Sequence, residues 1–313
     1  MAGFYAARSG TIPPLPWPIF APPLILLPVI AAGIVSGSAY ALLALGIVII
    51  FRSTDTVNFA IGDMATLGVY IAVTAIGFGV PVAGGLLIAI VVAGGTGVLT
   101  ERFLIRPLGA GHKSLFIALV VTIGLGLVIH AALGAIWGHR PTTIPAIIPG
   151  TASVFGVALT WNKIVATAIA LAAMALVAWF FRFTPMGVAM RASAEDHFAA
   201  RIVGINPGRI AALAWFLGCG LAAIAAFFLA MDTSVNANLT LAALFRAFAG
   251  VFLGGLTSMP GAAIGGFAIG ILDNLAGRYL SANYRDTIVF AVIVAVLFVR
   301  PSGFLGAGRK ERV

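Results

Sequence analysis

Three ionisable side chains lie inside long apolar stretches of this chain: Asp63, Arg246 and Asp273. Charges in such surroundings are costly, and in membrane proteins they face a cavity or an oppositely charged partner. A rise of about 1.5 Å per residue places Arg246 and Asp273 at nearly the same depth, with Asp63 roughly 12 Å away. We therefore expect an Arg246–Asp273 ion pair in preference to Arg246–Asp63, although a re-entrant second stretch would reverse that choice.

Motifs for catalysis are absent from the sequence. It contains no G-x-x-x-x-G-K-[ST] nucleotide loop, no H-E-x-x-H zinc motif and no G-x-S-x-G nucleophile motif. The four histidines are scattered and Cys219 is the only cysteine, which predicts neither a metal site nor a disulfide framework. We expect a chain that binds no cofactor and is not an enzyme.

A second candidate site lies in the hydrophilic loop after the fifth apolar stretch. Ser193 with Asp196 three residues later is close to a capping box, and Gly204 suits the position after a last helical turn. The run Asn206-Pro207-Gly208 ends a helix. These signals predict a short helix from Ala194 to Val203.

One side of that predicted helix is apolar. Phe198, Ile202 and Ile205 follow one another at steps of four and three residues, so they lie along the same side. An apolar side among charges suits docking on another protein. It equally suits a helix that lies on the lipid surface, and the spacing alone leaves both readings open.

The composition requires a membrane environment for these residues. Of 313 residues, 61% are hydrophobic and only 9% are charged, with a mean hydropathy of +1.13. Soluble domains carry about 25% charged residues, which excludes a soluble enzyme, a disordered protein and a coiled coil. The net charge is +9, and the basic residues lie mostly between the apolar stretches. We therefore explain the positive charge by membrane topology and expect no nucleic acid partner.

Apolar stretches that predict membrane-spanning helices recur along the whole chain. Only helices satisfy the backbone in lipid at such lengths, so the predicted fold is all-α and polytopic, with eight or nine transmembrane helices. The second and eighth stretches are short and interrupted by glycine, and we expect one broken or re-entrant element there or at the Pro260 turn. Small residues four apart, such as Gly250 with Gly254 and Gly261 with Gly265, predict close helix contacts. The nine stretches are Leu24–Phe51, Phe59–Phe78, Val82–Leu99, Leu115–Trp137, Ile164–Phe181, Ile210–Met231, Leu239–Leu256, Pro260–Ala276 and Thr287–Val299.

The basic residues predict the orientation. Twelve Lys and Arg residues fall in one alternating set of connections and five in the other, which places the richer set in the cytoplasm. If all nine stretches cross, the N-terminus lies outside and the C-terminus inside. The expected organisation is an extracytoplasmic Pro-rich lead-in (1–23), a single transmembrane domain (24–300) with a cytoplasmic loop at 183–209, and a basic cytoplasmic tail (301–313).

Thirteen short blocks occur in a recognisable order along the chain, namely Gly37–Gly46, Val57–Asp63, Glu101-Arg102, Arg106–Leu108, Met186-Gly187, Arg191-Ala192, Ala194–Asp196, Gly204–Asn206, Arg246–Phe248, Val251–Gly255, Pro260-Gly261, Ile264–Gly266 and Arg300–Gly303. Together these blocks resemble the LivH family, the membrane subunits of branched-chain amino acid ABC importers. The family commonly has His-Gly where this chain has Ile61-Gly62, Lys at Arg246, and Glu at Asp63 and Asp273. The charges of the last three positions are the same, so these departures bear on the choice of solute among amino acids, amides or urea rather than on architecture.

The resemblance implies a permease subunit in a bacterial-type cell membrane with defined partners. They are a LivM-like second permease, two cytoplasmic ABC ATPases that carry ATP and Mg²⁺, and an extracytoplasmic solute-binding protein, with lipid around the helices. The ATPases would dock on the loop helix. The residues that we expect to couple to them are Arg191, Glu195, Asp196, Phe198, Ala199, Ile202, Gly204 and Ile205.

The predicted solute path follows polar residues in the first two stretches. Hydroxyl and amide groups there can bind a zwitterion without trapping it, and transport would proceed by alternating access. Arg246 either lines this path or only fixes helix packing. The alternatives to an ABC permease are a stand-alone ion-coupled secondary transporter of small polar solutes and a membrane scaffold. The expected path residues are Ser36, Ser38, Tyr40, Asn58, Asp63 and Arg246.

Overall fold

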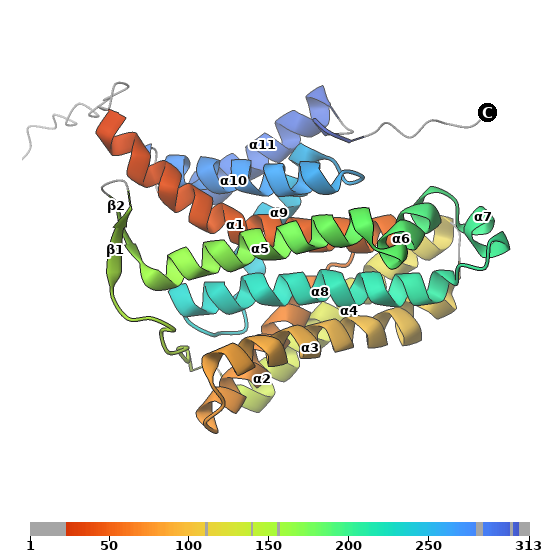
Figure 1. Cartoon of the computed structure of the whole chain (residues 1–313), viewed down its shortest axis with the longest axis horizontal. Coiled ribbons are helices and arrows are strands. Elements are labelled where there is room, and N and C mark those ends of the chain that lie inside the picture. The colour runs from red at the N-terminus through yellow and green to blue at the C-terminus, as the bar shows by residue number, and fades with distance from the viewer. Residues whose placement is uncertain are drawn as a thin grey trace, which may run out of the picture.

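The computed structural model describes residues 23–109, 112–138, 140–154, 157–279, 284–300 and 303–306. These residues form eleven α-helices and one short antiparallel hairpin. In Figure 1 most of the long helices run lengthwise through the molecule, with the hairpin at one end and helices α6 and α7 at the other. The predicted lead-in lies outside the described residues except for Pro23, and of the predicted tail only residues 303–306 are described.

Each of the nine predicted apolar stretches corresponds to a helix. Past α3 the chain continues as a π-helical turn (Glu101–Ile105) and a 3₁₀ turn (Arg106–Leu108). The hairpin of β1 (Thr151–Val154) and β2 (Val157–Thr160) was not predicted. The helices are α1 (Pro23–Thr54), α2 (Ile61–Gly77), α3 (Val82–Thr100), α4 (His112–Trp137), α5 (Trp161–Phe183), α6 (Pro185–Glu195), α7 (His197–Ile202), α8 (Pro207–Asp232), α9 (Leu241–Gly254), α10 (Met259–Tyr279) and α11 (Arg285–Val299).

Helix lengths divide the apolar elements into two groups. By length and composition, six helices of the described chain can cross a membrane, namely α1, α3, α4, α5, α8 and α10. The helices α2 and α9 are apolar but shorter, with 17 and 14 residues. The chain is therefore a polytopic, essentially all-α membrane protein.

Helix α1 is the centre of the bundle. Its residues from Ala39 to Ile50 are buried, and it packs on α10 along one side and on α8 along another. Small residues make these contacts close: Gly37 lies against Gly270, and Gly46 lies against Gly218. Because lipid supplies no hydrophobic drive between helices, such close backbone packing is a main source of their association.

Two non-helical segments, 55–60 and 233–240, enter the bundle before the short helices α2 and α9. Asn58 reaches Cys219, which lies near the middle of α8, so the first segment ends deep inside the bundle. The second segment pairs Val235 with Thr142 and then brings Thr240 to α2. Both short helices thus begin deep in the bundle.

The order of elements repeats with opposite direction. In α1–α4, a long helix is followed by a non-helical segment, a shorter helix and two further helices; α8–α11 follows the same order. Helices α1 and α8 run in opposite directions through the bundle (Figure 1). Inverted repeats of this kind, with broken helices at their meeting point, are typical of transporters.

The structure agrees with one of the two predicted positions of the interruption. The second stretch forms the short helix α2 after a non-helical segment, whereas the eighth stretch forms the continuous 21-residue helix α10, and the other short element is the seventh stretch, α9. These two helices form an antiparallel pair in which Gly250 and Gly254 lie against Gly265 and Gly261. The prediction of a break at the Pro260 turn is therefore wrong: the proline is the second residue of α10, where the backbone N–H needs no helical partner.

Candidate functional site

The intramembrane charge Arg246 lies in a network that joins four helices. Its Nε lies 3.0 Å from Oδ1 of Asp273 on α10, and one terminal nitrogen lies 2.8 Å from Asp286 at the start of α11. The hydroxyl of Tyr40 on α1 donates to Asp273 at 3.4 Å, and the guanidinium lies over the tyrosine ring. The Arg246 and Asp273 side chains are only 13% and 4% exposed, whereas Asp286 is 72% exposed. We call Tyr40, Arg246 and Asp273 the clasp, because they form a buried connection between α1 and the α9–α10 pair.

The other intramembrane acid, Asp63, has a different partner. Its Oδ1 lies 3.5 Å from Nδ1 of His130 on α4. The two side chains are 25% and 41% exposed, and both line a cavity of about 310 Å³ between α2, α4 and the start of α9. The structure thus separates Asp63 from Arg246 and places it beside a cavity.

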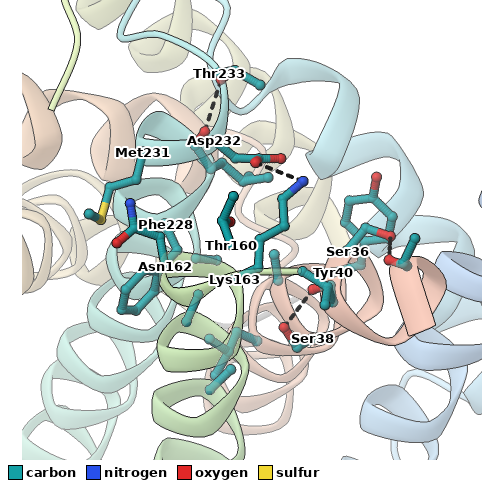
Figure 2. Close-up of a pocket in the computed structure, with 18 of the residues that line it drawn as sticks. Ser36, Ser38, Tyr40, Thr160, Asn162, Lys163, Phe228, Met231, Asp232 and Thr233 are labelled. Carbon is teal, nitrogen blue, oxygen red and sulfur yellow. Dashed lines mark hydrogen bonds and ion pairs between the residues drawn. The ribbon is translucent and has the colours of Figure 1, made fainter. Parts of the chain in front are cut away.

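Three of the predicted path residues line a second, larger cavity. Ser36, Ser38 and Tyr40 of α1 face a space of about 560 Å³ that is closed by α5, α8 and α10. In Figure 2, Lys163 of α5 reaches Asp232 at the end of α8, and their ion pair measures 2.9 Å. The cavity lies at the end of the bundle that carries the β1–β2 hairpin, since β2 and the start of α5 line it (Figure 1).

Hydrogen bonds inside the protein already occupy much of this polar lining. Ser38 donates to the carbonyl of Val35 at 2.7 Å, and Asn274 of α10 donates to the Ser36 hydroxyl at 2.7 Å. A hydroxyl that is engaged in this way still has acceptor capacity for a ligand. The cavity therefore offers partly satisfied groups, which favour weak and reversible contacts.

The predicted path residue Asn58 lines neither cavity. It is fully buried, its Oδ1 accepts from the backbone N–H of Ala60, and its amide nitrogen faces the sulfur atoms of Met64 and Cys219. The side chain closes the turn that leads into α2. Its placement makes Asn58 a structural residue of the non-helical segment in this conformation.

The hydrophilic loop forms two helices where one was predicted. Helix α6 ends at Glu195, and α7 spans His197–Ile202, so the predicted helix Ala194–Val203 is broken at Asp196. The capping residue is Asp196, whose Oδ1 accepts from the N–H of Ala199 at 3.0 Å. Ser193 lies buried within α6, because the chain turns three residues later than the capping-box pattern indicated. We call α6, α7 and their flanking turns (residues 184–206) the elbow.

Gly204 follows the last turn of α7, as predicted. Gly204 has a φ of +85°, its N–H bonds to the carbonyl of Arg201, and the N–H of Ile205 bonds to that of Ala200. This pair of bonds is a Schellman motif, which favours glycine because the left-handed conformation strains other residues. Asn206 then caps the next helix, with its side chain accepting from Gly208 and Arg209.

Both ends of the elbow are fixed to the bundle. At the α6 end, Thr184 caps the helix by accepting from the N–H of Gly187, and that glycine packs on the backbone of Phe180 and Phe181. At the α8 end, Arg106 forms a bidentate pair with Glu101 and donates to the carbonyl of Gly208 at 2.6 Å. These contacts connect the elbow to α5 at one end and to α8 and the turn after α3 at the other.

The outer surface of the elbow exposes apolar side chains to an unusual extent. Ile202 and Val203 are 72% and 74% exposed, and three of the residues predicted to couple to the ATPases, Arg191, Glu195 and Ala199, are also exposed. Ile205 is half-buried. The side chain of Phe198 lies outside the described residues. Figure 1 shows α7 projecting from the end of the bundle opposite the hairpin.

Comparison with known sequences identifies the family. Residues 29–297 match the family described as the permease component of branched-chain amino acid transport systems. The chain belongs to this family. As such a permease it is one component of an ABC transport system and is not itself an enzyme, and the system includes an ATPase and a binding protein.

Similarity to individual relatives extends over nearly the whole length. The permease is 33% identical over 296 residues to the high-affinity branched-chain amino acid permease LivH of Salmonella typhimurium, covering 90% of this chain and 96% of that protein. It is 31% identical over 296 residues to BraD of Pseudomonas aeruginosa, with the same coverages. A probable LivH of Methanocaldococcus jannaschii is 26% identical over 299 residues, covering 90% and 93%. The resemblance to LivH is therefore confirmed, and a stand-alone ion-coupled transporter and a scaffold are set aside.

Sequence reasoning missed His130, Lys163 and Asp286. The signal for His130 was available, because a histidine in the middle of an apolar stretch is an intramembrane ionisable residue like Asp63. The histidines were instead examined as metal ligands, which need several partners. Lys163 and Asp232 stand at opposite ends of two stretches, and no sequence pattern relates them.

Proposed function

We propose that this permease moves its solute by alternating access, driven by two ABC ATPases that grip the elbow. A LivM-like permease completes the channel, ATP and Mg²⁺ stay on the ATPases, and an extracytoplasmic binding protein delivers the solute at the hairpin end. The observation that carries the proposal is the elbow itself, with exposed apolar residues on a short helix that is clamped at both ends to the bundle. Apolar side chains that project beyond a membrane bundle among charges fit a protein partner.

The same proposal defines the membrane crossings. Nine crossings follow if α2 and α9 are each completed by the non-helical segment before them. The N-terminus then lies outside and the C-terminus in the cytoplasm of a bacterial inner membrane, as the distribution of basic residues predicts. Non-helical backbone at membrane depth is tolerated where it is buried or lines a cavity, and Thr240 lies in such a place.

In this proposal the cavity lined by Ser36, Ser38 and Tyr40 is an entry vestibule for the solute. It lies at the hairpin end, where the binding protein would deliver its load, and it carries both acidic and basic groups, among them Asp232 and Lys163. The clasp of Arg246 and Asp273 borders it through Asp273. We assign Arg246 a packing role rather than direct contact with the solute, since its guanidinium is engaged by two carboxylates.

The docking role is tested by changing the exposed apolar surface of the elbow. In the assembled transporter, Ile202→Asp is expected to lower ATPase capture and ATP-driven leucine uptake by tenfold or more, because a charge then lies in an apolar interface. The control is Phe78→Asp, which changes an equally prominent apolar residue in the turn after α2 at the opposite end of the bundle. Equal ATPase capture by the wild type and Ile202→Asp would overturn the docking role.

A further inference from the structure

The cavity between α2, α4 and α9 contains an aspartate–histidine pair that is separate from the clasp. Asp63 and His130 meet there at 3.5 Å, and both remain partly exposed. Charged side chains at membrane depth face water, a cavity or a partner, because lipid solvates them poorly. Their depth follows from the packing: Ile61 touches Gly46, and Gly46 lies against Gly218 near the middle of α8.

The remaining walls of the cavity are mostly apolar. Ile123 and Leu127 of α4 form one side, and Leu241 and Leu244 of α9 form another. Asn238 adds an amide from the non-helical segment before α9. The volume of about 310 Å³ lies at the lower end of the roughly 300–1,000 Å³ typical of small-molecule sites.

We infer that this cavity is a solute subsite in which Asp63 receives the α-ammonium group and His130 the α-carboxylate of an aliphatic amino acid. The inference rests on the proposed function and deepens it by locating where the zwitterion is recognised. The aliphatic side chain of the solute lies against the leucine and isoleucine walls, where its apolar surface is removed from water.

Charge balance makes the pair suitable for a zwitterion. A zwitterion offers an ammonium group for the Asp63 carboxylate and a carboxylate for the imidazole N–H of His130. Binding replaces the contact between the two side chains by one contact from each to the solute, so neither charge of the solute stays unpaired in a weakly polar site. A simple amine or a simple carboxylate would leave one of the two side chains without a partner, so the site discriminates against both.

A glycine on α4 provides space for the acid. A methyl group on Gly126 would lie 2.8 Å from Oδ2 of Asp63, so Gly126→Ala displaces the carboxylate without removing any charge. Gly124, two residues earlier on the same helix, has no heavy atom near the corresponding position. Gly124→Ala therefore makes the same chemical change on the same helix and leaves the pair undisturbed.

The test uses the complete transporter, with its ATPases and binding protein, in proteoliposomes that import radiolabelled leucine. Asp63→Asn and His130→Gln are each expected to lower uptake at least tenfold, while capture of the ATPases stays at the wild-type level. Exchanging the pair, with Asp63→His and His130→Asp together, restores part of the uptake because both solute charges again find partners. Wild-type uptake in either single variant overturns the inference.

The two glycine variants test the solute subsite without changing any charge. Gly126→Ala is expected to lower leucine uptake severalfold, whereas Gly124→Ala transports like the wild type. Equal uptake by these two variants overturns the inference even if the charge variants fail to assemble. If instead the wild-type complex imports no leucine on ATP addition, the proposed function fails, and that outcome is distinct from a defect confined to the variants.

Discussion

The two halves of the molecule, α1–α4 and α8–α11, follow the same order of elements in opposite directions, yet they hold their intramembrane charges differently. In the second half, Arg246 and Asp273 are 13% and 4% exposed and form a clasp with Tyr40. In the first half, Asp63 and His130 are 25% and 41% exposed beside a cavity. A repeated scaffold thus carries one pair that fixes helices and another that is accessible to a solute.

The non-helical segments show the same contrast in sequence. Asp55-Thr56-Val57-Asn58 precedes α2, and Asp232-Thr233-Ser234-Val235-Asn236 precedes α9. In both segments an asparagine caps its own turn: Asn58 accepts from the N–H of Ala60, and Asn236 accepts from the N–H of Asn238. The acids differ, because Asp55 lies in the first segment, whereas Asp232 is the last residue of α8 and pairs with Lys163 at the larger cavity. Similar local sequence therefore supports the same backbone break, while the neighbouring helices decide what each polar side chain contacts.

The largest expected effect is a loss of stability on removing Arg246, which should far exceed the loss on changing Asp63. Arg246→Ala leaves the buried carboxylate of Asp273 without its cation, and breaking a buried pair costs about 3–5 kcal/mol. Asp63→Asn removes a partly exposed pair and is expected to cost no more than about 1 kcal/mol. Thermal unfolding of the purified permease in detergent measures the difference.

The exchange Arg246→Asp with Asp273→Arg is the control for the clasp. It is expected to recover part of the lost melting temperature, because the pair is restored with its polarity reversed. Equal melting temperatures for Arg246→Ala and Asp63→Asn would contradict the distinction between a structural pair and an accessible one.

A smaller effect is expected from the glycines that pack α9 against α10 within the second half. Gly265 lies against the backbone of Gly250, so Gly265→Ala forces α9 and α10 apart, and overpacking of this kind costs about 1–3 kcal/mol. A methyl group added to Gly95 on α3 would have no heavy atom within 4 Å. Gly95→Ala is therefore expected to be neutral or slightly stabilising. Unfolding temperatures of the two variants in one detergent compare them, and equal losses would refute the packing argument.

The sequence predicted the helices of the bundle well, because each apolar stretch has few ways to satisfy its backbone in lipid. Depth counting also led to the Arg246–Asp273 pair, which the structure contains, although the count for Arg246 assumed that α9 starts at the membrane surface and α9 in fact begins deep in the bundle. It failed to anticipate the neighbour of Asp63, because α2 begins deep in the bundle and a count from its end assumes a helix that starts at the surface. The partner, His130, stands on a helix 67 positions away in sequence.

The elbow shows a different limit. Asp196 and Ser193 both satisfy the pattern for a helix N-cap, and only the packing of Ser193 within α6 decides between them. The hairpin β1–β2 was missed because its two four-residue strands lie in a polar connection without strong alternation. The local sequence patterns thus predicted that the chain turns in this loop, whereas tertiary contacts determine at which residue it turns.

The smallest expected effect concerns the joint between the two short helices. Thr66 of α2 and Thr240 before α9 lie with their hydroxyl oxygens 3.0 Å apart, and Thr66 also donates to the carbonyl of Gly62. Thr240→Val removes one hydrogen bond and leaves Thr66 its other partner, so the loss is about 0.6 kcal/mol, as for other hydrogen bonds between membrane helices. The shift is measured by thermal unfolding against the wild type. A loss above about 2 kcal/mol, more than the maximum expected for such a bond, would contradict the assignment of one ordinary hydrogen bond to this joint between the two halves.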